Sequence, residues 1–284
     1  MKSLIYLSLL LMMLLFPDLY VPAAYEALKI WGIDVVPSLF PYMIFSRLLA
    51  AQLRTTRIPP AYTAAFLGLL GGSPSGAAVL SVYGSSLSAR SLLSLSALTG
   101  TISPTFLLNT VNHWVHHTRF TRLLLICHLF SAISTATLSY AFIYAHPNRI
   151  HQLKDAFIGN TPPESPIQQS ISATLNIGGC IIMCSVVSVF VCKNPLFSSR
   201  PHLSACIHAL IEMSGGIHAL SLLPNTPLRA YLIAAVSGFS GFSMLIQNAY
   251  FLRPLGIGMS HQIVFALLRA SLSVLAMAVC LRLF

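Results

Sequence analysis

Residues 67–84 read LGLLGGSPSGAAVLSVYG, an apolar stretch that is interrupted near its middle by glycine, proline and serine. An α-helix needs roughly 20 residues to cross about 30 Å of hydrocarbon, so the stretch approaches the length of a membrane span. Proline and consecutive glycines free backbone groups that lipid cannot satisfy, and such a break survives only where it faces protein or a watery cavity. The stretch therefore predicts a broken helix that offers bare backbone and serine hydroxyls to a solute. Close packing of small residues is the alternative.

The composition of the whole chain agrees with a membrane environment. Hydrophobic residues make up 56% of the sequence and charged residues 8%, which leaves too little polar surface for a water-soluble globule. Lys2 precedes the first apolar run, but no small-residue cleavage site follows it, so we interpret the run as a retained helix. We predict membrane spans over residues 4–20, 61–84, 92–112, 122–145, 203–223, 229–252 and 262–284.

Charge, cysteines and motifs exclude several classes of function. The net charge is +10, but the lysines and arginines are scattered singly through short loops, which indicates contact with lipid headgroups and not with nucleic acid. The six cysteines have no CxxC spacing and are predicted to be reduced packing residues. No HExxH, GxSxG, Walker or GxGxxG pattern occurs, so the sequence predicts neither an enzyme nor a cofactor. The histidines of HWVHHTRF, residues 113–120, predict an interfacial belt in preference to a metal site.

Two further apolar stretches contain helix-breaking residues near their centres. Residues 35–51 include Pro37 and Pro41, and residues 167–192 include Asn176, Gly178 and Gly179. Because interrupted backbone at membrane depth must be shielded from lipid, we predict that both stretches are re-entrant hairpins.

An offset of about 140 residues aligns the two halves of the chain. It brings residues 36–49 onto 175–188, the Gly71, Gly72 pair onto Gly215, Gly216, and Asn109 onto Asn248. We therefore predict an N-terminal helix and interfacial segment over residues 1–34, repeats over 35–145 and 167–284, and a polar linker over 146–166. A hairpin followed by three spans makes an odd number of crossings, which would turn the second repeat upside down.

Glu212 is the acidic residue that lies well inside an apolar run. A buried carboxylate without a partner would take up a proton, so Glu212 is predicted to act in a proton relay or as a solute ligand. Helical spacing places His208, Gly215 and Gly216 on the same face. A structural ion pair with Arg269 is the alternative.

Other polar residues in apolar runs could contact a solute or serve the structure. Arg269 could clamp an anion through its planar fork, whereas Arg47 is predicted to extend to the membrane interface. The segment SGFSGFS, residues 237–243, supplies short side chains at mid-membrane depth. Ser103 precedes Pro104, which repeats the Ser-Pro pair of residues 73–74. The amides of Asn109, Gln247 and Asn248 could bind solute or tie helices together.

Five segments, taken in order, carry a resemblance to a known family: VVPSLFPYMIFSRLL, GLLGGSPSGA, TGTISPTFLLN, LIEMSGG and SGFSGFSMLIQ. The chain resembles the YlbJ/SpoVV family of sporulation integral membrane proteins, within the nucleoside-recognition Gate family. The resemblance runs from about Trp31 to the end. It implies a fold similar to concentrative nucleoside transporters, with two re-entrant hairpins, and export of dipicolinic acid towards a developing spore. It also implies that the site includes Pro37, Ser38 and Pro41 of the first hairpin motif, Gly72, Ser73 and Pro74 of the first unwound helix, Glu212 with Ser214, and Ser240, Gly241 and Ser243.

We therefore predict an all-α polytopic membrane protein that works as a secondary transporter of a small polar, anionic solute. It would lie in the cell membrane or the forespore-surrounding membrane of a spore-forming bacterium, in contact with lipid and compatible with a homo-oligomer. The alternatives are a scaffold for spore or envelope assembly that moves nothing and a nucleoside-type carrier. The predicted coupling or ion-pair residues are His208, Glu212 and Arg269, and no metal is predicted. The predicted substrate-binding residues are Pro37, Ser38, Pro41, Gly72, Ser73, Pro74, Ser75, Ser103, Asn109, Ser214, Ser240, Gly241, Ser243 and Asn248.

Overall fold

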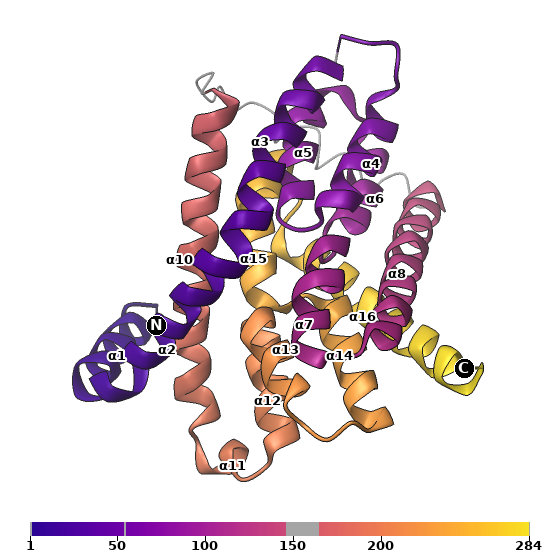
Figure 1. Cartoon of the computed structure of the whole chain (residues 1–284). Coiled ribbons are helices and arrows are strands. Elements are labelled where there is room, and N and C mark those ends of the chain that lie inside the picture. The colour runs from indigo at the N-terminus through magenta and orange to yellow at the C-terminus, as the bar shows by residue number, and fades with distance from the viewer. Residues whose placement is uncertain (1, 54, 146–164, 284) are drawn as a thin grey trace.

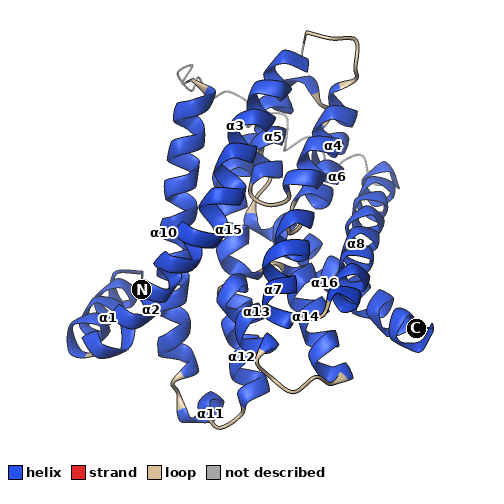
Figure 2. Cartoon of the chain, viewed as in Figure 1, coloured by secondary structure: helices blue, strands red, loops and turns tan. Residues whose placement is uncertain are grey.

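The protein is a helical bundle in which long helices flank shorter, broken ones (Figures 1 and 2). The computed structural model describes residues 2–53, 55–145 and 165–283, and every regular element in these ranges is a helix. Most of the predicted linker, residues 146–164, lies outside the described residues.

Long apolar helices make the chain a multi-pass membrane protein. The described residues contain four helical stretches long and apolar enough to cross a membrane. They include most of α8 (Thr118–Ala145), all of α10 (Pro166–Cys192) and α16 (Met259–Leu283), and a stretch over Pro227–Leu255. Large apolar side chains on these helices, such as Ile126, Val264 and Leu275, are more than half exposed. Lipid and not water is the solvent that such a surface requires.

The N-terminus departs from the predicted single span. Helix α1 (Lys2–Leu15) and helix α2 (Pro17–Lys29) meet at a bend of 101°. Pro17 begins α2, and Phe16 before it leaves the helical region, because the ring of a proline crowds the preceding residue. The predicted helix over residues 4–20 is therefore interrupted at Phe16.

The stretch predicted as the first re-entrant hairpin is one helix. Helix α3 (Val36–Leu53) continues directly from the π-helix η1 (Ile30–Val35), and Pro41 lies inside it without ending it. The π-helical turn, with its wider hydrogen-bond spacing, precedes Pro37, where a backbone N–H is missing. Neighbouring helices make a proline tolerable inside a membrane helix, so Pro37 and Pro41 did not mark a reversal of the chain.

The stretch predicted as the second hairpin is also one helix, α10. Gly178 lies inside α10 against the ring of Trp31, where an added Cβ would come within 2.5 Å of a ring carbon. The glycine therefore serves close packing with η1 and does not break the helix. Asn176 donates its side-chain N–H to the Ser172 carbonyl at 2.9 Å, which keeps its amide on its own helix.

Two helical hairpins do occur, but at other places in the sequence. The first joins α4 (Pro60–Gly71) to α5 (Ser75–Tyr83), and a Cβ added to Gly76 of α5 would lie 2.8 Å from the Gly68 carbonyl oxygen of α4. In a continuous helix two residues eight apart are separated by about 12 Å, so the chain turns back on itself at Gly72–Pro74. The predicted span over residues 61–84 is therefore a hairpin.

The second hairpin joins α12 (Pro201–Ile211) to α13 (Met213–Ser221). A Cβ added to Gly216 would lie 2.0 Å from the Ala209 Cα, so the two short helices touch at these positions. Its tip is Glu212, whose backbone is extended with φ −130° and ψ 112°. The predicted span over residues 203–223 is thus also a hairpin, and Gly216 lies where its two arms meet.

Two membrane helices are broken without reversing into hairpins. Helix α6 (Ala89–Thr99) ends before Gly100, and the chain resumes in the π-helix η3 (Phe106–Val111) and α7 (Asn112–Val115). Helix α14 (Pro227–Phe239) ends at Ser240, which has φ +71°, and α15 (Gly241–Leu252) follows at once. The remaining short elements are η2 (Gly84–Ser86), α11 (Pro195–Ser198) and η5 (Arg253–Leu255).

The order of elements recurs along the chain. In each half a helix, α3 or α10, is followed by a hairpin, a broken helix and a long helix, α8 or α16. Glu212 and Ser240 lie 140 residues after Gly72 and Gly100, so the breaks follow the offset that the sequence predicts. All four breaks lie in the middle part of the bundle (Figure 1).

Candidate functional site

The tip of the first hairpin is fixed against the break that follows α6. The Ser73 backbone N–H donates to the Thr101 carbonyl at 2.5 Å. Gly72 has φ +60°, and an added Cβ would lie 2.3 Å from the Ser103 backbone nitrogen. Glycine is needed at position 72 for both its left-handed backbone and this contact.

The tip of the second hairpin packs closely against the break between α14 and α15. Gly241 has φ +72°, and an added Cβ would lie 3.0 Å from the Ala209 carbonyl oxygen and 3.1 Å from the Met213 backbone nitrogen. Each hairpin tip therefore contacts the broken helix of its own half.

The Ser73 side chain joins the two halves at this level. The Ser73 hydroxyl lies 2.5 Å from the Asn248 side-chain oxygen and donates to it, although the two residues are 175 positions apart. Asn248 belongs to α15 and is buried. Asn248 therefore ties α15 to the tip of the first hairpin, and its predicted contact with a solute stays a prediction.

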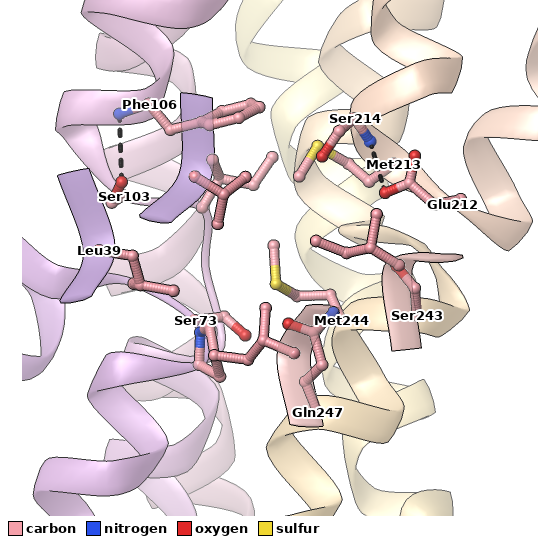
Figure 3. A pocket seen from close by; sticks show the side chains of 15 residues that line it. Leu39, Ser73, Ser103, Phe106, Glu212, Met213, Ser214, Ser243, Met244 and Gln247 are labelled. Carbon is pink, nitrogen blue, oxygen red and sulfur yellow. Dashed lines mark hydrogen bonds between the residues drawn. The ribbon is translucent and has the colours of Figure 1, made fainter. Parts of the chain in front are cut away.

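Residues from both hairpin tips and from both broken helices line one cavity (Figure 3). Its volume is about 50 Å³, which is room for one or two water molecules. Val35, Leu39, Phe106, Ile177 and Ile181 give it apolar walls. Four serines, one carboxylate and one amide supply its side-chain polar groups: Ser73, Ser103, Glu212, Ser214, Ser243 and Gln247.

Glu212 supplies the charged side chain of this cavity and is 1% exposed. Its Oε1 accepts from the Ser214 backbone N–H at 3.0 Å, and its Oε2 accepts from the Gly215 backbone N–H at 2.6 Å. The carboxylate therefore caps the N-terminus of α13, where free N–H groups and the helix dipole favour negative charge. In Figure 3 the Glu212 side chain lies beside Ser214 at the edge of the cavity.

Arg269 is not the partner of Glu212. The arginine, on α16, is 1% exposed and donates from Nε to the Gly238 carbonyl at 3.2 Å and from Nη1 to the Ala97 carbonyl at 3.1 Å. These carbonyls belong to the last turns of α14 and α6, whose oxygens lose their helical partners at the breaks. The predicted ion pair with Glu212 is therefore wrong, because the guanidinium bridges the two broken helices instead.

His128 of α8 also contacts a backbone carbonyl at a helix break, and the sequence patterns did not indicate this role. It is fully buried, and its Nε2 lies 3.2 Å from the Ile102 carbonyl oxygen in the break after α6. The repeat offset offered a signal, since a shift of 140 residues places His128 one position before Arg269. Each long helix thus provides one nitrogen-bearing side chain to the broken backbone.

His208 lies near Glu212, as its spacing predicts. A Cβ added to Gly215 would lie 2.9 Å from the His208 Nε2 and 3.2 Å from the Glu212 Oε2. Among the described residues, the buried Nε2 of His208 has no hydrogen-bond partner. His208, Glu212 and Gly215 therefore share one face of the second hairpin, with a vacant hydrogen-bonding nitrogen beside the carboxylate.

The predicted substrate-binding residues divide into three groups. Ser73, Pro74, Ser103, Ser214 and Ser243 line the cavity. A second group lies at the breaks without lining the cavity, and Gly72, Ser75, Ser240, Gly241 and Asn248 form it. The third group is not brought to the site: Pro37, Pro41 and Asn109 are exposed, and the Ser38 side chain lies outside the described residues.

Arg47 also differs from its prediction as an interfacial side chain. It is buried, its Nη1 donates to the Gln169 Oε1 at 2.8 Å, and its guanidinium lies 5.4 Å from the centre of the Phe251 ring. Arg47 therefore joins α3 to α10 and α15 from inside the bundle.

The remaining candidate groups show no further chemistry. The six cysteines are free thiols. No group of three potential metal-ligating side chains occurs in the described part of the chain. Within the segment HWVHHTRF, Trp114 packs between Phe106 and His218. Comparison with protein-family models, curated proteins and solved structures finds no match for this chain.

Proposed function

We propose that the protein is a secondary membrane transporter for a small polar solute, which binds where the two hairpin tips meet the two broken helices. The observation that carries the proposal is that residues from both hairpin tips and from both broken helices line one cavity. Interrupted backbone at membrane depth is costly unless protein or a polar cavity surrounds it. Binding sites formed by broken helices near the midplane are the recurrent design of secondary transporters.

The recurring order of elements supports an inverted repeat. If α3 spans the membrane as α10 does, each half would make three crossings, through that helix, the broken helix and the long helix, because a hairpin enters and leaves on one side. The linker over residues 146–164 contains no apolar run long enough to cross. An odd number of crossings reverses the second half, so the hairpins would enter from opposite sides.

The small cavity indicates a closed state in this proposal. Sites for drug-sized ligands usually occupy about 300–1,000 Å³, several times the volume found here. A solute would therefore bind only after a hairpin tip or an adjoining helix moves aside. Alternation between two such openings would carry it across without ATP.

The charge of the cavity limits the identity of the solute. Glu212 would repel an anion unless it is protonated, and Arg269 does not neutralise it. Transport of an anion such as dipicolinic acid, which the resemblance to the YlbJ/SpoVV family suggests, would thus involve a proton on Glu212. A spore-surrounding membrane would be its location. The hydroxyl-rich lining also favours a second candidate, a nucleoside-type neutral solute.

Flux through reconstituted vesicles tests the proposal. Proteoliposomes would be supplied with pyridine-2,6-dicarboxylate, other dicarboxylates and nucleosides at several pH values, with and without a pH gradient. We expect saturable flux of one class, with pH-dependent flux for the dicarboxylate, and Glu212→Gln should remove that dependence. Absence of flux for every solute, together with a tightly bound protein partner, would favour the scaffold alternative.

A further inference from the structure

A groove between α10 and α15 opens on the lipid-facing side of the bundle. It encloses about 700 Å³, and the two helices are neighbours in Figure 1. Its rim includes Ile246 and Tyr250 of α15, which are 45% and 54% exposed, and Asn176 of α10, which is also exposed. Ala173 and Ile177 form its buried floor. Because large exposed apolar side chains on these helices require lipid as their solvent, the groove opens to the bilayer.

We propose that this groove binds one anionic phospholipid, with an acyl chain between α10 and α15 and the headgroup phosphate on Arg253. The site does not depend on transport, because it requires only that the chain lies in a membrane with these two helices side by side. The depth, the charge and the lining of the groove each support it.

Arg253 lies at the depth of the lipid headgroups. The stretch Pro227–Leu255 is long enough to cross the membrane, and the break at Ser240 lies near its centre. Helix α15 runs outward from this break for 12 residues, which is about 18 Å, whereas half of the hydrocarbon core measures about 15 Å. Arg253 follows directly and reaches the phosphate layer. Ile246, seven residues earlier, lies about 10 Å deeper, where a phospholipid presents its hydrocarbon.

The charge at this depth is positive and uncompensated. Arg253 is exposed, and it forms no ion pair in the described part of the chain, where the one ion pair joins Lys29 to Glu26. No acidic residue lines the groove. A second guanidinium, that of Arg47, lies 5.4 Å from the centre of the Phe251 ring in the groove wall. An arginine fork matches two phosphate oxygens, and basic pockets between membrane helices attract lipids with a net negative headgroup.

The lining below Arg253 suits a hydrocarbon chain. Tyr250 is an aromatic side chain at the interface, and its ring lies 5.0 Å from that of Phe251 and nearly perpendicular to it. The small Ala173 leaves room beside these rings. Gln247 lines both the groove and the central cavity, and in Figure 3 its side chain extends among the other residues of that cavity. The groove therefore keeps mainly apolar surface for an acyl chain.

Native mass spectrometry of the purified chain in detergent tests the headgroup preference. Phosphatidylglycerol and phosphatidylcholine with identical acyl chains would be titrated separately. We expect one phosphatidylglycerol to bind more tightly than phosphatidylcholine, and Arg253→Gln to weaken its binding about fivefold, the equivalent of one cation at the membrane surface. Arg253→Lys should retain most of the affinity, and Arg200→Gln, at an exposed arginine outside the groove, should retain all of it. Inorganic phosphate should not compete, because the acyl chain contributes to binding.

A native thiol locates the bound lipid. Cys180 lines the groove, and Cys184, one turn further along α10, does not. Single-cysteine proteins that keep either thiol would be placed in phosphatidylcholine nanodiscs, with or without phosphatidylglycerol, and treated with a lipid-soluble maleimide. We expect phosphatidylglycerol to slow labelling of Cys180 several-fold, to leave Cys184 unaffected, and to lose its effect in Arg253→Gln.

Three results would overturn the inference. The first is equal affinity of the unmodified protein for the two lipids, and the second is an unchanged preference in Arg253→Gln. The third is protection of Cys180 that appears only together with a dimer in the native mass spectrum, since a second copy of the chain would then cover the groove.

Discussion

At the scale of single residues, the helix breaks are stabilised by side chains that satisfy freed backbone groups. Glu212 accepts from two N–H groups at the start of α13, and Arg269 donates to one carbonyl in each of α6 and α14. Asn248 accepts from the Ser73 hydroxyl at the tip of the other hairpin. The polar residues of the membrane interior therefore hold an interrupted backbone as well as line a cavity.

Removal of the Arg269 guanidinium should destabilise the protein. Arg269→Met would leave the Ala97 and Gly238 carbonyls without their donor, at a cost of about 1–3 kcal/mol for each buried group. The melting temperature in detergent should fall by several degrees, and Arg269→Lys should recover part of the loss. Arg282→Met, at an exposed arginine near the end of the same helix, is the control. Equal melting temperatures for Arg269→Met and Arg282→Met would contradict the assigned role.

The cap formed by Glu212 predicts a separable effect on stability and transport. Glu212→Gln keeps an oxygen acceptor at the start of α13, so the melting temperature should change little while the pH dependence of flux disappears. Glu212→Ala removes the cap and should cost about 1 kcal/mol in the free energy of unfolding. A thermal-shift assay beside the flux assay distinguishes the two. Similar destabilisation by Gln and Ala would argue against the capping geometry.

At the scale of elements, the positions of glycine determine which helices touch. Gly178 of α10 faces the Trp31 ring, whereas an added Cβ at Gly179 would meet nothing within 4 Å. The two neighbouring glycines therefore form a matched pair, one in a contact and one in open space.

We expect opposite effects from alanine at these two positions. Gly178→Ala should lower the melting temperature because the new methyl group collides with Trp31, whose ring cannot withdraw without loss of its packing. Gly179→Ala should leave stability unchanged or raise it by up to about 1 kcal/mol, since alanine favours a helix. Thermal unfolding in one detergent provides the comparison. A loss of stability in Gly179→Ala but not in Gly178→Ala would contradict the packing of α10 on η1.

The sequence revealed the breaks better than it revealed the hairpins. Glycine, serine and proline predicted an interrupted helix at GGSPSG, and the interruption occurs. SGFSGFS was predicted to supply short side chains at mid-membrane depth, and α14 ends within it. A hairpin over residues 60–83 has the apolar length of one span, so composition could not separate the two, and only the contact between Gly68 and Gly76 decides. Pro41 and Gly178 misled the prediction because tertiary contacts and a π-helical turn accommodate them within continuous helices. The role of Arg269 could be identified only from the tertiary structure, since its partners are backbone carbonyls from two distant helices.

At the scale of the whole molecule, the two halves are proposed to have opposite orientations, with hairpins that enter from opposite sides. The loop between α3 and α4 and the segment around α11 lie at opposite ends of the bundle in Figure 1. In a cysteine-free background, Thr56→Cys and Ser198→Cys should react with a membrane-impermeant maleimide from opposite sides of oriented vesicles. Labelling of both from one side would contradict the inverted arrangement.

The central claim is that a solute crosses through the cavity where the hairpin tips and broken helices meet. Ser73 and Asn248 join the two halves beside this cavity, and Ser73 lines it. Flux would be measured in proteoliposomes that contain Ser73→Cys with Asn248→Cys, before and after treatment with a short bifunctional thiosulfonate. We expect flux to stop when the thiols are bridged and to return on reduction, while each single variant continues to transport. Undiminished flux through fully bridged protein would contradict the account.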